Sequence, residues 1–401
     1  MRDQWILRGC GNAFAIHGQV RMSMPPQGGW PPPNQPGPPP NQGQPFGPQY
    51  NPQQPPPGWQ QGAWSPQPTP PPQKGGSLKW LLVAVAVLLV IGITVGATLL
   101  FTRDNGGGGT TTSTSGAPSD IASANDTGPV TIITDEPTCD AFNSVNNGLA
   151  ELEPNGWGVK RATFGPASQW TPEQRSQVET VAESMRKAAD LAVPLAKQTP
   201  HRVVRELYEQ FIAYGRAYAD SMETYVPQDN ELASANINAS SALIGICNAI
   251  DNGATSRSLA IESAAPPSSV LSPGDPADPT QFIGSFESSC QTWVERLDRF
   301  NADTVDWQKR DGTVPASEWT SEQRALAGAT EPLLRSYATD IENVGRQSDN
   351  PLFEDFALSA GLYIRAFVSA TDSYTSADGW LNYAGFRIAN LVSSACRAVE
   401  G

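Results

Sequence analysis

Two closely matched stretches carry tryptophans that could contact a ligand in this 401-residue chain. Each reads A-S-[Q/E]-W-T-x-E-Q-R, one beginning at Ala167 and the other at Ala316, an offset of 149 residues. Large aromatic faces bind apolar groups and cations. Trp170 and Trp319 are therefore candidate ligand or partner contacts.

The same stretches also have the pattern of a helix start. Thr171 is followed three residues later by Gln174, and Thr320 by Gln323. This spacing is a capping box, in which each side chain binds the backbone N–H of the other residue. Capping, with the tryptophan packed against the first turns, is the favoured interpretation, and ligand contact is the alternative.

Arg216 and Arg365 are two further candidates, because the offset of 149 places them at equivalent positions. Each follows a stripe tyrosine, Tyr214 or Tyr363, by two residues, which is roughly 200° round a helix. They therefore lie off the predicted core face. A salt bridge to a neighbouring helix is the simpler role, and contact with an anion or partner is the functional one.

Acid–base and metal chemistry find few suitable residues. The chain has 2 histidines, and His201 has Asn350 at its equivalent position. The folded part contains no C-x-x-C, H-E-x-x-H, G-x-S-x-G or phosphate-binding glycine loop. We predict a non-enzymatic protein with no catalytic residue, cofactor or metal. A pair of carboxylates acting as a hydrolase remains an alternative.

An internal duplication positions all these residues. Between residues 167 and 247, about 18 of 81 positions match residues 316–396 without a gap, and the match ends on Cys247 and Cys396. Upstream, Cys139 matches Cys290 at an offset of 151. We name residues 137–251 copy one and residues 287–401 copy two, with a Pro-rich linker at 252–286.

Apolar residues recur at intervals of three and four in both copies, which predicts helices and no strands. Four helices are expected per copy, as an up-down-up-down bundle. In such a bundle the first helix starts where the fourth ends, so Cys139 would bond Cys247 and Cys290 would bond Cys396. The expected ranges are 139–152, 171–198, 201–226 and 230–250 in copy one, and 288–303, 320–346, 350–375 and 379–399 in copy two.

The first third of the chain has a different composition. Residues 1–21 resemble an extension from a misassigned start, because Met22 or Met24 opens a Pro/Gln/Gly-rich tail at 22–79. Residues 80–101 are apolar and uncharged, and about 20 such residues span a bilayer. A Gly/Thr/Ser-rich stalk follows at 102–136.

Charge gives the orientation and excludes one class of partner. Lys74 and Lys79 precede the apolar run, which places the N-terminus in the cytoplasm and both copies outside the plasma membrane. Gly92 and Gly96 form a G-x-x-x-G pair compatible with a homodimer. The net charge of -14 excludes a general nucleic-acid binder.

This layout resembles the proline-rich, single-pass membrane proteins of actinobacteria, especially mycobacteria. The resemblance lies in Met24-Pro25-Pro26 and its tail, the anchor at 80–101, the Gly/Thr stalk and the alanine-rich outer part with paired cysteines. It implies a location in the cell envelope and no particular reaction, since most of these proteins have no known function.

We therefore expect a membrane-anchored envelope protein whose duplicated helical domain binds a partner or ligand. The alternative is a structural tether or assembly scaffold acting through a cytoplasmic partner of the Pro-rich tail. The second alternative is a carboxylate-dependent envelope hydrolase. Exposed aromatic residues clustered between the two copies would favour the first hypothesis, and a uniformly charged surface the second. A cleft with two carboxylates about 5–10 Å apart would favour the third.

Overall fold

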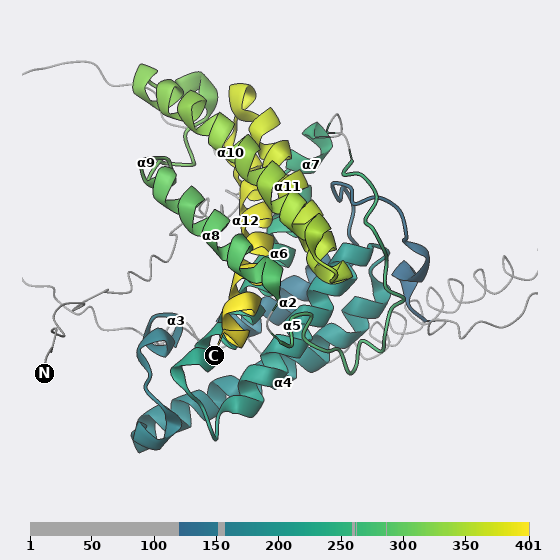
Figure 1. Cartoon of the computed structure of the whole chain (residues 1–401), viewed down its shortest axis with the longest axis vertical. Coiled ribbons are helices and arrows are strands. Elements are labelled where there is room, and N and C mark those ends of the chain that lie inside the picture. The colour runs from purple at the N-terminus through teal and green to yellow at the C-terminus, as the bar shows by residue number, and fades with distance from the viewer. Residues whose placement is uncertain (1–119, 151–156, 259–260, 262, 286, 401) are drawn as a thin grey trace, which may run out of the picture. The chain divides into compact units, whose positions relative to one another are not determined.

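The computed structural model describes residues 120–150, 157–258, 261, 263–285 and 287–400 (Figure 1). The predicted start extension, the Pro-rich tail, the apolar run at 80–101 with its glycine pair and most of the stalk lie outside these residues. Within them, no helix is both long enough and apolar enough to cross a bilayer.

The described residues form helices and no strand, as the spacing of apolar residues predicts. Those of copy one are α2 (Cys139–Ala150), α3 (Trp157–Lys160), α4 (Pro172–Gln198), α5 (Arg202–Ser221), α6 (Asn230–Asp251) and, just beyond, α7 (Ala254–Arg257). Those of copy two are α8 (Ser288–Asp303), α9 (Val305–Gln308), α10 (Ser321–Gln347), α11 (Pro351–Ser369) and α12 (Gly379–Val399).

The third long helix of each copy is shorter than predicted. α5 ends at Ser221 and α11 at Ser369, whereas the expected ends were 226 and 375. The stripe tyrosines Tyr225 and Tyr374 lie beyond these ends, and their carbonyls accept hydrogen bonds from Ala167 and Ala316, each at 2.9 Å. The apolar spacing continues past the helix ends because both tyrosines are buried in the core although they lie outside the helices.

Both predicted disulfides are present. Cys139 bonds Cys247 with their Cα atoms 5.6 Å apart, and Cys290 bonds Cys396 with a Cα separation of 5.3 Å. Each bond closes a loop of more than 100 residues, between the start of one helix and the end of the fourth long helix. Each copy is therefore closed separately by its own covalent link.

The two copies pack against each other through α6 and α12, which lie side by side between the other long helices (Figure 1). Gly245 permits close approach, because a Cβ there would lie 2.9 Å from the Cα of Ala384. Asn238 and Arg387 are equivalent in the duplication, and they hydrogen-bond to each other at 3.3 Å. Contact between equivalent residues is the mark of a local two-fold interface.

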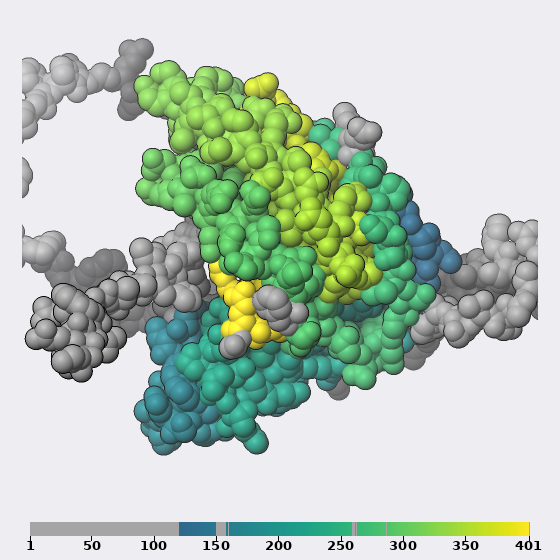
Figure 2. Space-filling model, viewed as in Figure 1, coloured from purple at the N-terminus to yellow at the C-terminus, as the bar shows by residue number. Residues whose placement is uncertain are grey.

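The segment between the copies also contacts the helices. Gln210 of α5 accepts a hydrogen bond from the backbone of Phe282 at 3.0 Å, and Asn350 donates one to the carbonyl of Phe282 at 2.6 Å. Ile283 is 2% exposed. This part of the predicted linker is thus held against both copies. In Figure 2 the end of α12 is visible between the surfaces of the two copies.

The last residues of the predicted stalk are likewise packed on the folded part. Ile121, Val130 and Ile133 are buried, and the carbonyl of Val130 accepts a hydrogen bond from Ala264. The sequence did not indicate this, because Ile121 and the short group Val130, Ile132 and Ile133 are too few to form a helical period.

Candidate functional site

The repeated tryptophan stretch is a pair of helix starts, as the capping interpretation predicts. Thr171 and Gln174 form the complete capping box of α4, and Thr320 and Gln323 form that of α10. The indole N–H of Trp170 donates to the carbonyl of Gly165 at 2.7 Å, and the indole of Trp319 donates to the carbonyl of Val314 at 2.9 Å. The two stretches are therefore built alike.

Their surroundings differ, because Trp319 lines a cavity in copy two. The cavity has a volume of about 30 Å³. A buried water needs about 10–15 Å³ on this scale, so the cavity holds the end of one side chain and not a whole drug-sized ligand. Its walls come from α9, α10, α11 and the turns beside them: Trp307, Arg310, Asp311, Trp319, Gln323, Leu326, Ala327, Glu331, Leu334, Phe367, Thr371 and Tyr374.

In copy one, larger side chains occupy the equivalent place. Phe164, Val178 and Met222 pack there with Tyr218 and Tyr225 in a separate core cluster. The offset of 149 replaces these three side chains in copy two by smaller ones: Thr313, Ala327 and Thr371. Two of these smaller residues, Ala327 and Thr371, line the cavity.

Arg310 is the cation of this cavity. Its guanidinium carbon lies 3.8 Å from the centre of the Trp307 ring and 5.7 Å from that of Phe367. One N–H donates to the carbonyl of Trp307 at 3.2 Å. Among the described residues, no carboxylate lies within ion-pairing distance of Arg310.

The equivalent arginine of copy one is held quite differently. Arg161 donates to the side chain of Asn230 at 2.6 Å and to the hydroxyl of Ser234 at 3.3 Å. Copy two has Gly379 and Tyr383 at those two positions, and Arg310 hydrogen-bonds to neither of them. Arg310 contacts the carbonyl of Trp307 and the hydroxyl of Tyr374, and others of its five N–H groups remain for a molecule that enters the cavity.

Burial lowers the pKa of Arg310 from its ordinary value, while the hydroxyl of Tyr374 opposes the shift. Arginine remains a cation at neutral pH even so. Two carboxylates lie at the rim, and both are engaged. Asp311 accepts hydrogen bonds from Thr313, and Glu331 pairs with Arg335 at 2.9 Å.

The two arginines singled out in the sequence both make salt bridges to a neighbouring helix, the simpler of their two predicted roles. Arg216 pairs with Asp190 at 2.7 Å, and Arg365 pairs with Glu342. Burial raises the pKa of Glu342, and Arg365 opposes that shift. Neither arginine lines the cavity in copy two. Contact with a partner at these positions stays a prediction.

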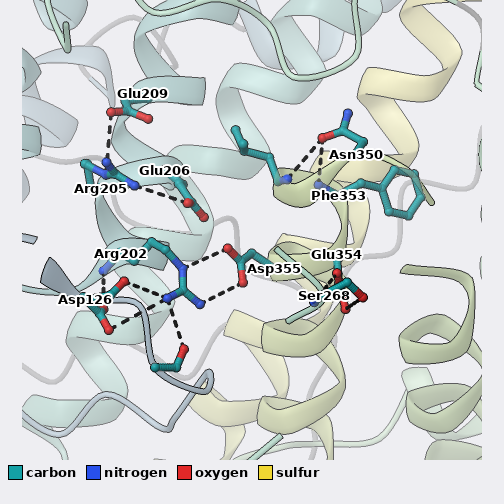
Figure 3. Close-up of polar contacts among 12 residues, drawn as sticks. Asp126, Arg202, Arg205, Glu206, Glu209, Ser268, Asn350, Phe353, Glu354 and Asp355 are labelled. Atoms are coloured by element: carbon teal, nitrogen blue, oxygen red, sulfur yellow. Dashed lines mark hydrogen bonds and ion pairs between the residues drawn. The ribbon is translucent and has the colours of Figure 1, made fainter. Parts of the chain in front are cut away.

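A second group of charges lies where α5 and α11 meet (Figure 3). Arg202 donates to both carboxylate oxygens of Asp355, at 2.9 and 3.0 Å, and the pair is 2% and 1% exposed. Its guanidinium also donates to the carbonyls of Asp126 and Gly128, at 2.8 and 3.1 Å. This buried ion pair joins copy one directly to copy two.

The duplication makes Glu206 the equivalent of Asp355, but Glu206 has no arginine across the interface, because Arg202 is matched by Pro351. Its contact is Arg205, at 3.3 Å, and one of its oxygens has no hydrogen-bond partner within the described part. Burial raises the pKa of Glu206 well above its ordinary value, and the negative charge of Asp355 adds to the shift. Burial also raises the pKa of Asp355, and Arg202 opposes that shift.

These carboxylates do not match the open cleft expected of a hydrolase. Glu206 and Asp355 are 2% and 1% exposed, so a substrate in solution does not reach them. No group of three or more His, Cys, Asp or Glu side chains in the described ranges could hold a metal ion.

Sequence reasoning found Trp319 and missed Arg310, Trp307 and Phe367. A signal was present for Arg310, since Arg161 stands at the same offset six residues before the motif. A search for identical residues in the two copies does not reveal the cavity, because the cavity lies where the two sequences differ.

Within its described residues, the protein is all-helical. It is built from a duplicated unit, and each copy is closed by its own disulfide. A family model described as "Mycobacterial ESX-1 associated protein" matches residues 121–400, and the chain belongs to this family. An uncharacterized protein of Mycolicibacterium smegmatis (strain MKD8) is 40% identical over 335 residues, covering 82% of this chain and 89% of the relative. No solved structure matches. These matches confirm the mycobacterial part of the resemblance.

Proposed function

We propose that this chain is a non-enzymatic, membrane-anchored protein of the mycobacterial cell envelope whose helical domain binds a protein partner. Residues 80–101 would anchor it, with the two copies as tandem four-helix bundles outside the membrane. The two disulfides are consistent with an oxidising compartment.

The observation that carries the proposal is the cavity in copy two. It combines aromatic walls with an arginine that has no acidic partner among the described residues, while the matched place in copy one is filled. Apolar walls with a few polar groups are typical of binding sites. Aromatic residues and arginine are also the side chains most enriched at protein contacts.

The family name supplies the context for the partner. Because the family is described as ESX-1 associated, we propose that the partner belongs to ESX-1. The described residues from Ile121 to Glu400 correspond to the family match, which favours the helical part over the Pro-rich tail as the working part.

Photo-crosslinking in mycobacterial cells tests this function. A photoreactive phenylalanine replaces Asp311 at the cavity rim of the full-length chain, and the matched control replaces Ala162 in copy one, which is also exposed. An adduct is expected from position 311 and not from position 162, and it should disappear in cells without ESX-1.

The same experiment in a chain lacking residues 22–73 separates the two non-enzymatic hypotheses. Adducts at position 311 that persist without the tail support binding by the helical domain. Adducts that disappear with the tail would favour the scaffold hypothesis, in which the tail engages a cytoplasmic partner.

A further inference from the structure

We infer that the cavity in copy two recognises the free C-terminal carboxylate of a partner chain whose last residue has a small apolar side chain. This inference rests on the proposed function and specifies its ligand. It follows from the size of the cavity, the charge of Arg310 and the surroundings of the rim.

The size of the cavity limits the apolar part of the ligand. A volume of about 30 Å³ corresponds to roughly two or three water molecules, so the apolar group that enters must be small, as in alanine or valine. The walls that receive it are Trp307, Trp319, Leu334 and Phe367, which present carbon surface. A bulky or strongly polar side chain does not fit such a space.

The charge of Arg310 defines the polar part. Its planar guanidinium matches a carboxylate with two parallel hydrogen bonds. Because Arg310 itself lines the cavity, the anion and the apolar group must lie within one residue of each other. A C-terminal residue satisfies this condition, since its α-carboxylate and its side chain leave the same Cα atom.

The rim disfavours more highly charged anions. Asp311 and Glu331 also line the cavity, and the charge of Asp311, which has no salt bridge within the described part, repels phosphate or a cluster of acidic side chains. A single carboxylate next to an apolar group meets less of this repulsion. The equivalent arginine of copy one, Arg161, donates to Asn230 and Ser234 and lies beside a filled core, so the site belongs to copy two.

The test uses the full-length chain in detergent micelles, labelled with 5-fluorotryptophan. The ¹⁹F signals of Trp307 and Trp319 are assigned with Trp→Phe variants. Two probes are compared: N-acetyl-Ala-Ala-Val with a free carboxylate, and the same tripeptide as its C-terminal amide. The acid should shift both signals in a saturable way, with an affinity about tenfold or more above that of the amide.

Three variants assign the effect to the cavity. Arg310→Gln should lower the affinity of the acid probe to that of the amide probe. Arg310→Lys should keep part of the preference for the acid because it keeps the positive charge. Thr371→Met restores the residue of copy one and should abolish binding of both probes. Arg216→Gln, a variant at a surface ion pair, should change nothing. The ¹⁹F signal of the buried Trp293 shows that each variant is folded.

The inference is overturned by equal shifts from acid and amide, by a preference that survives in Arg310→Gln, or by no shift of Trp307 and Trp319 at millimolar probe. Saturable shifts with inorganic phosphate would also overturn it, because they would show a general anion site. Crosslinks at position 311 in cells, combined with any of these results, would retain partner binding and reject only the ligand chemistry.

Discussion

Copy one and copy two keep the same scaffold and differ in how they fill it. Both have the capping box, the indole hydrogen bond and the disulfide. Copy one fills the space beside Trp170 with side chains that include Val178 and Met222, whereas copy two has Ala327 and Thr371 at those positions and a cavity beside Trp319. The duplicated scaffold is thus packed at this place in copy one and holds a cavity in copy two.

The same contrast holds for charge. Arg202 of copy one pairs with Asp355 of copy two, but the reverse pair is missing because Pro351 takes the place of an arginine. Glu206 is left with a raised pKa beside a satisfied aspartate. A local two-fold arrangement with one ion pair on one side is therefore electrostatically asymmetric.

The largest effect is expected from breaking this ion pair. Arg202→Met should lower the free energy of unfolding by about 3–5 kcal/mol, because Asp355 is left buried without its cation. Urea denaturation followed by circular dichroism measures it. The control is Arg186→Met, which removes an exposed pair with Asp220 and should cost less than about 1 kcal/mol.

The double variant Arg202→Met/Asp355→Leu sharpens the result. It removes both charges, and so it should recover most of the lost stability. A single variant that costs less than about 1 kcal/mol would show that water reaches Asp355, and that the two copies do not depend on this pair.

The second effect distinguishes the filled copy from the open one. Met222→Ala should cost about 2 kcal/mol, because it opens a cavity in the packed cluster of copy one. Thr371→Ala, at the equivalent position of copy two, should cost less than about 0.5 kcal/mol, since that side chain already borders a cavity. Equal losses in thermal unfolding would mean that the two sites are packed alike.

The sequence was sufficient to predict the long helices and the pairing of the disulfides. Capping boxes and apolar spacing are local, and the duplication selected one disulfide pattern from three. The packing of the copies was not predictable in this way. Asn238 and Arg387 meet although neither belongs to a shared apolar stripe, and Gln210 and Asn350 bind a segment far away in the chain.

The site was predicted only in part for a related reason. Comparing the copies reveals what is identical, and so it found Trp319, which is matched by Trp170 and directly precedes the N-cap of α10. The cavity depends on Ala327 and Thr371, two positions where the copies differ. Substitution to a smaller residue leaves space only if the backbone stays in place, which the sequence does not show.

The third prediction uses the raised pKa of Glu206. The folded protein holds a proton that the unfolded chain releases above its ordinary pKa of 4.5. The contribution of Glu206 to the free energy of unfolding is complete below pH 4.5. It is lost as the pH rises through the pKa of the folded state, by about 1.4 kcal/mol per pH unit. Glu206→Gln should remove that slope, so its stability relative to the wild type should increase with pH.

The equivalent substitution in copy two should act in the opposite direction. Asp355→Asn leaves Arg202 buried with a neutral partner, so it should destabilise the protein at neutral pH. Free energies of unfolding measured from about pH 5 to pH 8 compare the two variants. A pH slope in Glu206→Gln equal to that of the wild type would show that Glu206 is ionised in the folded protein.

The smallest effect concerns the two equivalent arginines. Arg365→Gln should cost about 1 kcal/mol, because its partner Glu342 is only 18% exposed and loses the cation that opposes the rise in its pKa. Arg216→Gln should cost less than about 0.5 kcal/mol, since Asp190 is 71% exposed and water replaces the ion pair. Chemical denaturation at low and high salt measures both. Salt should weaken the Arg216 pair more than the Arg365 pair, because exposed charges are screened and buried ones are not. The reverse order would mean that equivalent positions in the two copies do not take their energetics from burial.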